Sequence, residues 1–255
     1  MILALDMGNT NILIGGYEND RLLFTARMHT AVWRTADEWA LLLGDILRRN
    51  GLESRAIEGS IVSSLVPPVT GALADGVGAV CQKPPLIVGA EGVKAGLKVC
   101  IDHPALLGAD MICNAVAALT RTVPPIIIID MGTATSIGVI DSQGQFIGGA
   151  IVPGVRTSAS ALSNNAAQLP HIHLQAPSRV IASNTVECMQ SGLLFGTAAL
   201  IEGMCSRVEE ELGQPCTVLA TGGLSETVAP LIRRPVIHAP DLLLEGLYQI
   251  YLRNR

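Results

Sequence analysis

The chain has 255 residues, of which 49% are hydrophobic and only 15% are charged, and this composition excludes a disordered polyelectrolyte. The 22 Asp and Glu residues outnumber the 17 Lys and Arg residues, and aromatic residues make up 3%. A chain with a formal charge of -5 and so few rings lacks the positive field and the stacking surfaces that nucleic acids require. We therefore expect no nucleic-acid partner.

The sequence also argues against a membrane protein. Its first residues show no signal-peptide pattern, and the longest uncharged apolar stretch, residues 61–73, is too short to cross a bilayer. The six cysteines form no CxxC pair. We expect a cytoplasmic protein with reduced, buried thiols and no membrane partner.

In the first half of the chain, the pattern predicts alternating strands and helices. Residues 2–6 form an apolar run that predicts a buried strand, and after a polar turn residues 12–17 fold back as a hairpin. Apolar residues at helical spacing predict a helix over residues 35–50. Short buried strands are predicted at residues 61–62 and 86–88.

The second half continues this alternation. A helix face over residues 111–119 ends before a pair of prolines at 124–125, where we place the boundary between the halves. Residues 126–130 begin a second strand and hairpin. A long helix is predicted over residues 189–210, and a strand at 218–220.

The two halves resemble each other at an offset of 124 residues. The sequence ILALDMGNTN begins at Ile2, and IIIIDMGTAT begins at Ile126. In each copy a buried strand ends in Asp, followed by Met and Gly and then by hydroxyl or amide side chains. We therefore predict two similar α/β domains, residues 1–120 and 121–255, with a ligand cleft between them.

The repeated turn is suited to phosphate. Its Gly lets the backbone approach a ligand, the neighbouring amides and hydroxyls donate hydrogen bonds, and the Asp can hold a cation. One such turn is common in hairpins without a function, but two symmetric copies favour phosphate binding.

Other familiar motifs are absent. There is no GxxxxGKS/T and no GxSxG, and after Gly76 and Gly78 the position of a third dinucleotide-loop Gly holds Cys81. His171 and His173 share one face of a predicted surface strand, with no nearby Cys or carboxylate to complete a metal site. A Rossmann enzyme and an α/β-hydrolase are therefore disfavoured.

Taken together, the motifs resemble those of type III pantothenate kinases, members of the actin-like, acetate-kinase-like ATPase superfamily. The resemblance covers nearly the whole chain and implies two duplicated RNase H-like (actin-like ATPase) domains. The matching stretches are DMGNTN from Asp6, GAD from Gly108, NAVA from Asn114, DMGTAT from Asp130, GGAIVPG from Gly148, AQLP from Ala167, NT from Asn184, MQSG from Met189 and TGG from Thr221.

The resemblance implies ATP-dependent phosphorylation of the hydroxyl of pantothenate to 4'-phosphopantothenate, the first step of coenzyme A biosynthesis. It implies ATP, Mg²⁺ and a monovalent cation (K⁺ or NH₄⁺) as cofactors, and a homodimer. The residues implied for ATP are Asp6, Met7, Gly8, Asn9, Thr10, Asn11, Ile12, Leu13 and Thr133. Asp6 would also help to hold Mg²⁺, and Asp130 would bind the monovalent cation.

The same resemblance assigns the acceptor pocket. Asp110 would be the general base that takes the proton of the substrate hydroxyl. The residues implied for pantothenate are Gly108, Ala109, Asp110, Met111 and, from the partner subunit, Thr185. The residues themselves leave simpler alternatives open, because Asp110 and Thr185 both suit a helix cap and the TGG sequence suits a tight turn.

The chain departs from the family pattern mainly around the acceptor. Met111 stands where the family has Arg, and Ile101 stands where it tends to have Tyr. Gly138 and Ala182 replace a usual Asp and a usual Gly. A thioether cannot pair with an anion as a guanidinium does, so Met111 makes the pocket less cationic.

Three alternatives remain open. The first is an active pantothenate kinase, in which an arginine from elsewhere, such as Arg156 or Arg121, compensates for Met111. The second is a diverged paralogue that phosphorylates another small alcohol. The third is a non-catalytic nucleotide-binding regulatory protein, against which the retained Asp110 argues.

Overall fold

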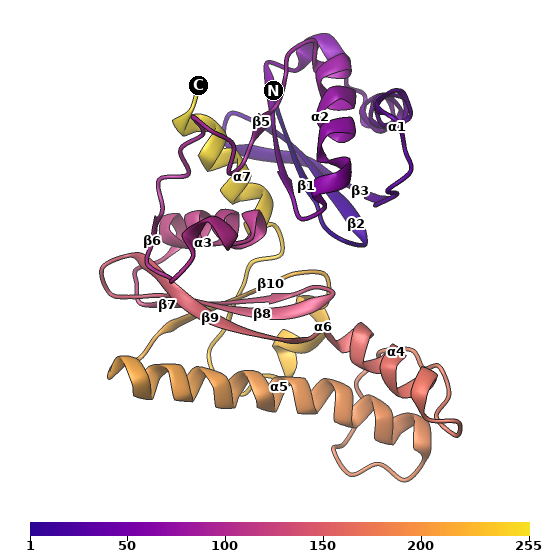
Figure 1. Ribbon diagram of the computed structural model, residues 1–255. Coiled ribbons are helices and arrows are strands. Elements are labelled where there is room, and N and C mark those ends of the chain that lie inside the picture. Colours follow the sequence, from indigo (N-terminus) through magenta and orange to yellow (C-terminus); the bar gives the residue numbers. More distant parts are fainter. The chain divides into compact units, whose positions relative to one another are not determined.

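The computed structural model in Figure 1 describes all 255 residues and divides the chain into two compact units. Unit 1 comprises Met1–Leu97, His103–Ala117 and Leu242–Arg255, and unit 2 comprises Lys98–Asp102 and Ala118–Asp241. None of the helices is both long enough and apolar enough to span a membrane.

Unit 1 contains a five-stranded sheet with the strand order β3-β2-β1-β4-β5. The strands are β1 (Ile2–Met7), β2 (Asn11–Glu18), β3 (Arg21–His29), β4 (Gly59–Ser64) and β5 (Leu86–Ile87). The first three strands pair antiparallel, while β4 runs parallel to β1 and β5 runs parallel to β4. The predicted hairpin and both short strands are confirmed.

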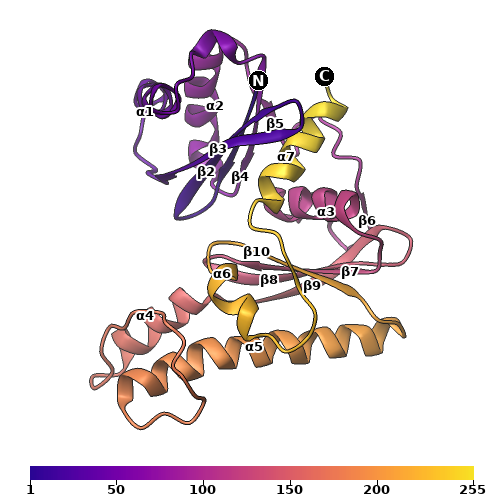
Figure 2. The ribbon, with the colours of Figure 1, turned by 180° about the vertical axis from the view of Figure 1, so that it is seen from behind.

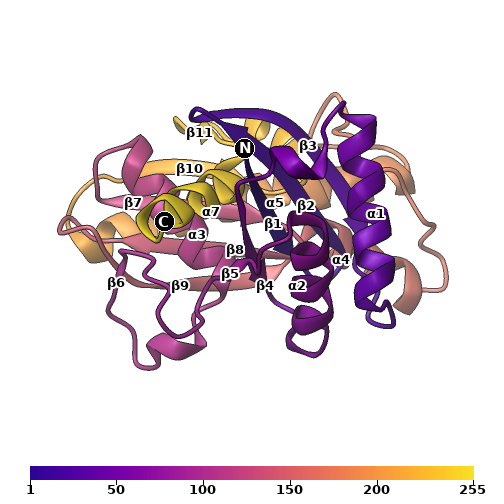
Figure 3. The same cartoon turned by 90° about the horizontal axis from the view of Figure 1, so that it is seen from above.

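The first strand is buried on both faces, which explains its uninterrupted apolar sequence. Leu3 and Leu5 belong to the core under α1 (Ala36–Arg49) and α2 (Pro67–Cys81), the two neighbouring helices in Figure 3. Ile2 and Ala4 belong to a second core, with the apolar side of α7 (Leu242–Arg253) and part of α3 (Ala109–Arg121).

The helix predicted over residues 35–50 is confirmed as α1. The Thr35 side chain accepts a hydrogen bond from the amide of Glu38, and the Thr35 amide donates one to the Glu38 carboxylate, so the two residues form a capping box. The helix ends at Asn50, and Gly51 follows with a φ of 70°.

The C-terminal helix packs in unit 1, whereas the predicted second domain, residues 121–255, contained it. Gly246 lies so close to α3 that an added Cβ would be 1.9 Å from the carbonyl oxygen of Cys113. The ring of Tyr248 stacks on Tyr17 of β2, with centroids 4.4 Å apart. This long-range packing has no signature in the order of the elements along the chain.

Unit 2 repeats the arrangement of unit 1 with one strand added at an edge. Its sheet has the order β11-β10-β7-β8-β9-β6. The strands are β6 (Lys98–Val99), β7 (Ile126–Met131), β8 (Ala134–Ile140), β9 (Gln145–Pro153), β10 (Thr217–Thr221) and β11 (Ile237–His238). The hairpin of β7 and β8 matches that of β1 and β2, so the duplication inferred from the sequence is confirmed.

A long helix, α5 (Thr185–Leu212), runs along one face of this sheet, as Figure 2 shows. Its residues Leu194 and Ile201 pack with Ile127 and Ile129 of β7. The predicted helix at 189–210 is therefore confirmed and extended at both ends. The remaining helices are α4 (Val155–Asn165), α6 (Ser225–Val228) and three short 3-10 turns, Ser54–Ala56, Pro104–Leu106 and Ala229–Leu231.

Two expectations from the sequence are wrong. His171 and His173 are exposed, but they lie in no strand, because this segment pairs with no neighbouring strand. Burial of all the cysteines is also wrong, since Cys100 and Cys188 are exposed. All six are free thiols, as expected.

Candidate active site

The first predicted phosphate turn joins β1 to β2. Met7 and Ile12 are the last paired residues, and residues 8–11 form the turn, closed by a 3.0 Å hydrogen bond from the Gly8 amide to the Asn11 carbonyl. The side chains of Met7 and Ile12 are buried in the core of unit 1. These two residues can therefore offer only their backbone to a ligand.

Asp6 lies at the end of β1 and is only 8% exposed. The hydroxyl of Ser63, its register partner on β4, donates a 2.5 Å hydrogen bond to Asp6 Oδ1. Ser63 is fully buried, so this bond limits the orientation of the carboxylate. Ser63 has no signature in the sequence, because no sequence motif sets the register of β1 and β4.

A second residue that no sequence motif marks, Thr30, also bonds to the first turn. The hydroxyl of Thr30, just after β3, donates a 2.6 Å hydrogen bond to the Gly8 carbonyl. The Thr30 amide donates a 3.0 Å hydrogen bond to the Thr10 carbonyl. Two carbonyl oxygens of the turn are thus bound to a single residue.

The predicted base, Asp110, is the second residue of α3 and is therefore not its N-cap. Its carboxylate accepts a 2.8 Å hydrogen bond from the Met111 amide. Burial raises the pKa of Asp110 above its ordinary value, although backbone hydrogen bonds oppose this shift. A Cβ at Gly108 would lie 2.4 Å from Asp110 Oδ1, so glycine there makes room for the carboxylate.

One turn further along α3, the thiol of Cys113 is influenced by the charges of both Asp6 and Asp110. The thiol is fully buried, and its pKa is raised well above the usual value by burial and then by the charges of Asp6 and Asp110. A hydrogen bond with Ser63 opposes this shift. The structure therefore brings the carboxylate of the first turn and the predicted base into the same part of unit 1, where the charges of both act on one buried thiol.

The second predicted phosphate turn joins β7 to β8 in unit 2. Met131 and Thr135 are the last paired residues, and residues 132–134 form a turn closed by a 3.0 Å hydrogen bond from the Gly132 amide to the Ala134 carbonyl. Thr133 is exposed within it. Its carbonyl oxygen accepts hydrogen bonds from the amide of Gly154 at 3.1 Å and from the hydroxyl of Thr157 at 2.6 Å.

The TGG sequence packs directly on Asp130. Thr221 is its register partner on β10, and the next residue, Gly222, has a φ of 90°. A Cβ on Gly222 would lie 2.4 Å from Asp130 Oδ1 and 2.5 Å from the Met131 amide nitrogen. Only glycine satisfies both the backbone conformation and this close approach.

A serine and a histidine support this turn. The Ser225 hydroxyl donates a 2.7 Å hydrogen bond to the Gly222 carbonyl and lies 3.0 Å from His238 Nε2. Because its proton is used toward Gly222, the Ser225 oxygen accepts the proton of His238 Nε2. Neither residue was singled out from the sequence.

Thr185 is the exposed first residue of α5. The helix cap is its neighbour Asn184, whose side chain accepts a 3.0 Å hydrogen bond from the Glu187 amide. The simpler interpretation of Thr185 as a cap is therefore wrong, and its hydroxyl is not required to begin the helix.

The structure contains no group of three or more His, Cys, Asp or Glu side chains that could hold a metal ion. Single carboxylates such as Asp6 fit an ion of the Mg²⁺ type, which keeps several waters and binds one or two carboxylates together with substrate phosphates. They do not fit a dedicated protein cage of the kind that holds structural zinc.

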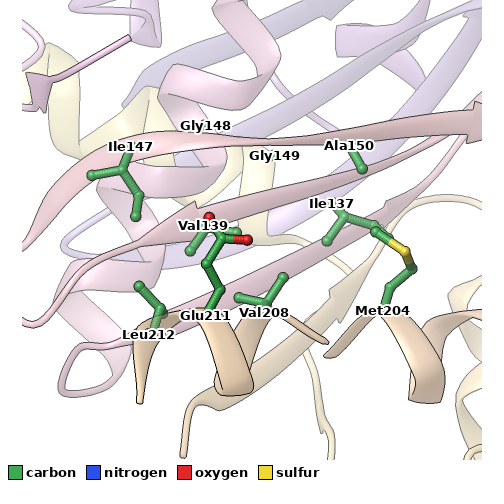
Figure 4. A pocket seen from close by; sticks show the side chains of 10 residues that line it. All are labelled: Ile137, Val139, Ile147, Gly148, Gly149, Ala150, Met204, Val208, Glu211 and Leu212. Carbon is green, nitrogen blue, oxygen red and sulfur yellow. The ribbon is translucent and has the colours of Figure 1, made fainter. Parts of the chain in front are cut away.

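Unit 2 also contains a cavity of about 210 Å³ between α5 and the strands β8 and β9 (Figure 4). It is lined by Ile137, Val139, Ile147, Gly148, Gly149, Ala150, Met204, Val208, Glu211 and Leu212. None of these residues was predicted to bind substrate or cofactor, and the cavity is separate from the turns described above.

Comparison with solved structures shows which known proteins share this fold. The activator of 2-hydroxyisocaproyl-CoA dehydratase from Clostridium difficile, solved with bound ADPNP, has a TM-score of 0.58 at 13% identity, over 98% of this chain and 93% of that one. ROK hexokinase from Thermus thermophilus has a TM-score of 0.52 at 14% identity, over 100% and 99% of the two chains. The protein therefore has the mixed α/β fold of actin-like ATPases and sugar kinases.

The sequence comparisons identify the family. Residues 2–207 match the profile of type III pantothenate kinase. A type III pantothenate kinase from Roseiflexus castenholzii is 43% identical over 259 residues, an alignment that covers both chains completely. The chain belongs to the type III pantothenate kinase family, which confirms the resemblance drawn from its motifs.

Proposed function

We propose that this protein uses ATP to phosphorylate the hydroxyl of pantothenate to 4'-phosphopantothenate, the first step of coenzyme A biosynthesis. One observation in the structure supports this most strongly. A half-buried carboxylate with a raised pKa, Asp110, shares the surroundings of Cys113 with Asp6 of the first predicted phosphate turn. Phosphoryl transfer requires a positioned phosphate and an acceptor activated nearby.

In this proposal the first turn binds the phosphates of ATP mainly through its backbone. Asp6 is held at a fixed orientation by Ser63 and helps to hold Mg²⁺, which neutralises phosphate charge when bound. Thr133, exposed on the second turn, contacts nucleotide phosphate. Asp130, supported by Gly222, binds the monovalent cation, K⁺ or NH₄⁺.

Asp110 acts as the general base. A carboxylate is a more effective base when its pKa lies nearer the working pH, and burial shifts the pKa of Asp110 in that direction. The amide of Met111 holds the carboxylate in place. Gly108, Ala109 and Met111 surround it and line the acceptor pocket.

A cytoplasmic homodimer is part of the proposal. Three glycines of α5, Gly192, Gly196 and Gly203, are exposed with nothing within 4 Å of an added Cβ. Each costs a helix about 1 kcal/mol relative to alanine, which is understandable where a second helix must approach closely. Thr185, exposed at the start of the same helix, is available to the pocket of a partner subunit.

A second candidate function is phosphorylation of another small alcohol. The observation that favours it is Met111, half-buried beside Asp110 where the family pattern has an arginine. A less cationic pocket favours a less anionic acceptor.

The test is ATP consumption by the purified protein, with and without pantothenate, in potassium and in sodium buffer. Pantothenate-dependent turnover that requires potassium and is lost in Asp110→Asn is expected. Asp75→Asn, which changes an exposed Asp on α2, is the matched control and should behave as the wild type. Nucleotide binding without turnover on pantothenate would contradict the proposal, and gain of turnover in Met111→Arg would locate the fault in the acceptor pocket.

A further inference from the structure

We propose that Thr30 and Thr157 are a matched pair of positioning residues, each of which sets the orientation of the phosphate turn in its own unit. The inference rests on the proposed function, because it assumes that the two turns bind ATP. It adds two residues that lie outside every motif used to recognise the family.

In both units a threonine hydroxyl donates to a carbonyl oxygen of the turn. The distance is 2.6 Å from Thr30 Oγ1 to the Gly8 carbonyl and 2.6 Å from Thr157 Oγ1 to the Thr133 carbonyl. In both units a backbone amide of the same segment donates as well, from Thr30 to the Thr10 carbonyl and from Gly154 to the Thr133 carbonyl. Each turn is therefore held from one side by a side chain and a backbone group.

These bonds determine where the turn amides point. A peptide unit is planar and trans, so its carbonyl oxygen and its amide hydrogen point in opposite directions. When Thr30 holds the Gly8 carbonyl, the amide of Asn9 points away from Thr30. When Thr157 holds the Thr133 carbonyl, the amide of Ala134 points away from Thr157.

The two bonds come from the segment that follows the third strand of each unit, but not from equivalent residues of the repeat. The repeat has an offset of 124 residues, whereas Thr30 and Thr157 are 127 residues apart. Thr30 comes directly after β3, while Thr157 is the third residue of α4. The stretch after the third strand therefore holds each turn through non-equivalent residues, since Thr30 corresponds to Gly154, and Gly8 corresponds to Gly132 rather than to Thr133. A threonine hydroxyl on a turn carbonyl is thus present in both units without being copied position by position, as expected if a fixed turn orientation is itself required.

The packing of Gly154 supports this in unit 2. A Cβ on Gly154 would lie 2.4 Å from the Gly132 carbonyl and 2.5 Å from the Thr133 carbonyl. Glycine therefore brings the start of α4 against the turn closely enough for Thr157 to reach it. In unit 1 the close approach is made by the Thr30 backbone instead.

The experiment measures the affinity of each purified full-length variant for a non-hydrolysable ATP analogue by calorimetry, together with its melting temperature. Thr30→Val and Thr157→Val keep the side-chain shape and remove the hydroxyl. We expect Kd to rise roughly tenfold for the half-buried Thr30 and roughly threefold for the exposed Thr157, the range for loss of one positioning hydrogen bond. The KM for pantothenate should stay unchanged.

Two controls separate positioning from general stability. Thr30→Ser and Thr157→Ser retain the hydroxyl and should bind the analogue within about twofold of wild type. Thr197→Val removes a hydroxyl that donates to the Leu193 carbonyl inside α5, away from both turns, and should leave Kd unchanged.

Variants Thr30→Val and Thr157→Val that bind the analogue like wild type would overturn the inference, while turnover by wild type would leave the proposed function standing. A rise of Kd in Thr197→Val equal to theirs would also overturn it, since the effect would then be general. Failure of the wild-type protein to bind the analogue would overturn both proposals.

Discussion

The two predicted phosphate turns each close an antiparallel hairpin but differ in length and in their neighbours. The turn of unit 1 has four residues between its last paired positions, and the turn of unit 2 has three. In unit 1 the neighbouring strand places the Ser63 hydroxyl on a nearly buried Asp6. In unit 2 the neighbouring strand places Gly222 against a more exposed Asp130.

This difference shows what a duplication preserves. The hairpin fixes where each aspartate lies, because the aspartate comes at the same point of the same antiparallel pairing. The adjacent parallel strand then determines what surrounds each aspartate. In unit 1 it provides the hydroxyl of Ser63, and in unit 2 it leads to Gly222, which has no side chain. An enclosed, oriented carboxylate and a more exposed one suit the two different cation roles proposed for Asp6 and Asp130.

The largest effect is expected at Asp110, the proposed general base of unit 1, for which no counterpart is proposed in unit 2. Asp110→Asn should lower kcat by a factor on the order of 10² to 10⁴, the usual contribution of a general base. Affinity for nucleotide should be unchanged, because the first turn is intact. Steady-state kinetics with calorimetric binding checks this, and an equal loss of binding would show that Asp110 supports the turn instead.

The same variant has a stability signature. Burial raises the pKa of Asp110 in the folded state, so the stabilisation from its protonated form is present in acid and is lost as pH rises through the raised pKa. Asp110→Asn should therefore melt at or above the wild-type temperature at pH 7, and the difference should shrink in acid. A lower melting temperature at pH 7 would contradict the burial argument.

The second prediction compares a glycine at each turn. Gly222→Ala should lower the free energy of unfolding by about 2–4 kcal/mol, because its φ is positive and its Cβ would overlap Asp130 and Met131. Gly8→Ala should cost less than about 1 kcal/mol, because its Cβ would lie 3.2 Å from one carbonyl oxygen. Urea unfolding measures both, and similar values would remove this difference between the turns.

The third prediction concerns the register partners of the two aspartates. Ser63→Ala should destabilise the protein by about 1–3 kcal/mol, since it removes the buried hydroxyl that donates to Asp6. Thr221→Val, at the equivalent position, should cost less, because water can reach the more exposed Asp130. Thermal unfolding of both variants gives the comparison, and a larger loss for Thr221→Val would reverse our account of the two carboxylates.

The smallest effects on stability are expected for two ion pairs, one in each unit. In unit 2, the hydrogen bond from Arg234 lowers the pKa of the mostly buried Glu209. A lowered pKa stabilises the fold above about pH 4.5, and this stabilisation is lost as pH falls through the lowered value. Glu209→Gln should thus cost about 1 kcal/mol at pH 7 and less in acid.

In unit 1, the hydrogen bond from the N-terminal amine lowers the pKa of Glu58, which is exposed. Glu58→Gln should have no measurable effect on melting at pH 7, because water screens an exposed pair. Melting curves of both variants at pH 7 and pH 3 provide the test. A decrease in the melting temperature of Glu209→Gln that is equal at pH 7 and pH 3 would rule out an electrostatic origin.

Much of the secondary structure followed from local pattern. The capped helix α1, the long helix α5 and both hairpins were predicted from apolar spacing and turn residues, because these signals lie within a few residues of one another. The extended segment at residues 171–173 was misassigned, since alternation of exposure does not guarantee a pairing strand. The packing of α7 in unit 1 depended on contacts with residues more than a hundred positions away.

The residues of the candidate site likewise include some that the sequence predicts and others that only the structure shows. Asp6, Asp130, Gly8 and the TGG sequence could be found because they stand in repeated or recognisable motifs. Ser63, Thr30 and Thr157 could not, because the side chain of each donates a hydrogen bond to a residue at least 22 positions away in the chain. A single Ser or Thr has no local signature that separates such a bond from an ordinary surface hydroxyl.

The sequence by itself determined the family, the duplicated α/β hairpins and the residues at the two turns, since these depend on motif identity and on local periodicity. Only the tertiary structure decided the environment of each carboxylate: the hydroxyl on Asp6, the glycine against Asp130, and the burial that raises the pKa of Asp110. The physical reason is that hydrogen bonding and desolvation depend on which strands and helices become neighbours. That choice is made by long-range packing of the cores rather than by adjacent residues.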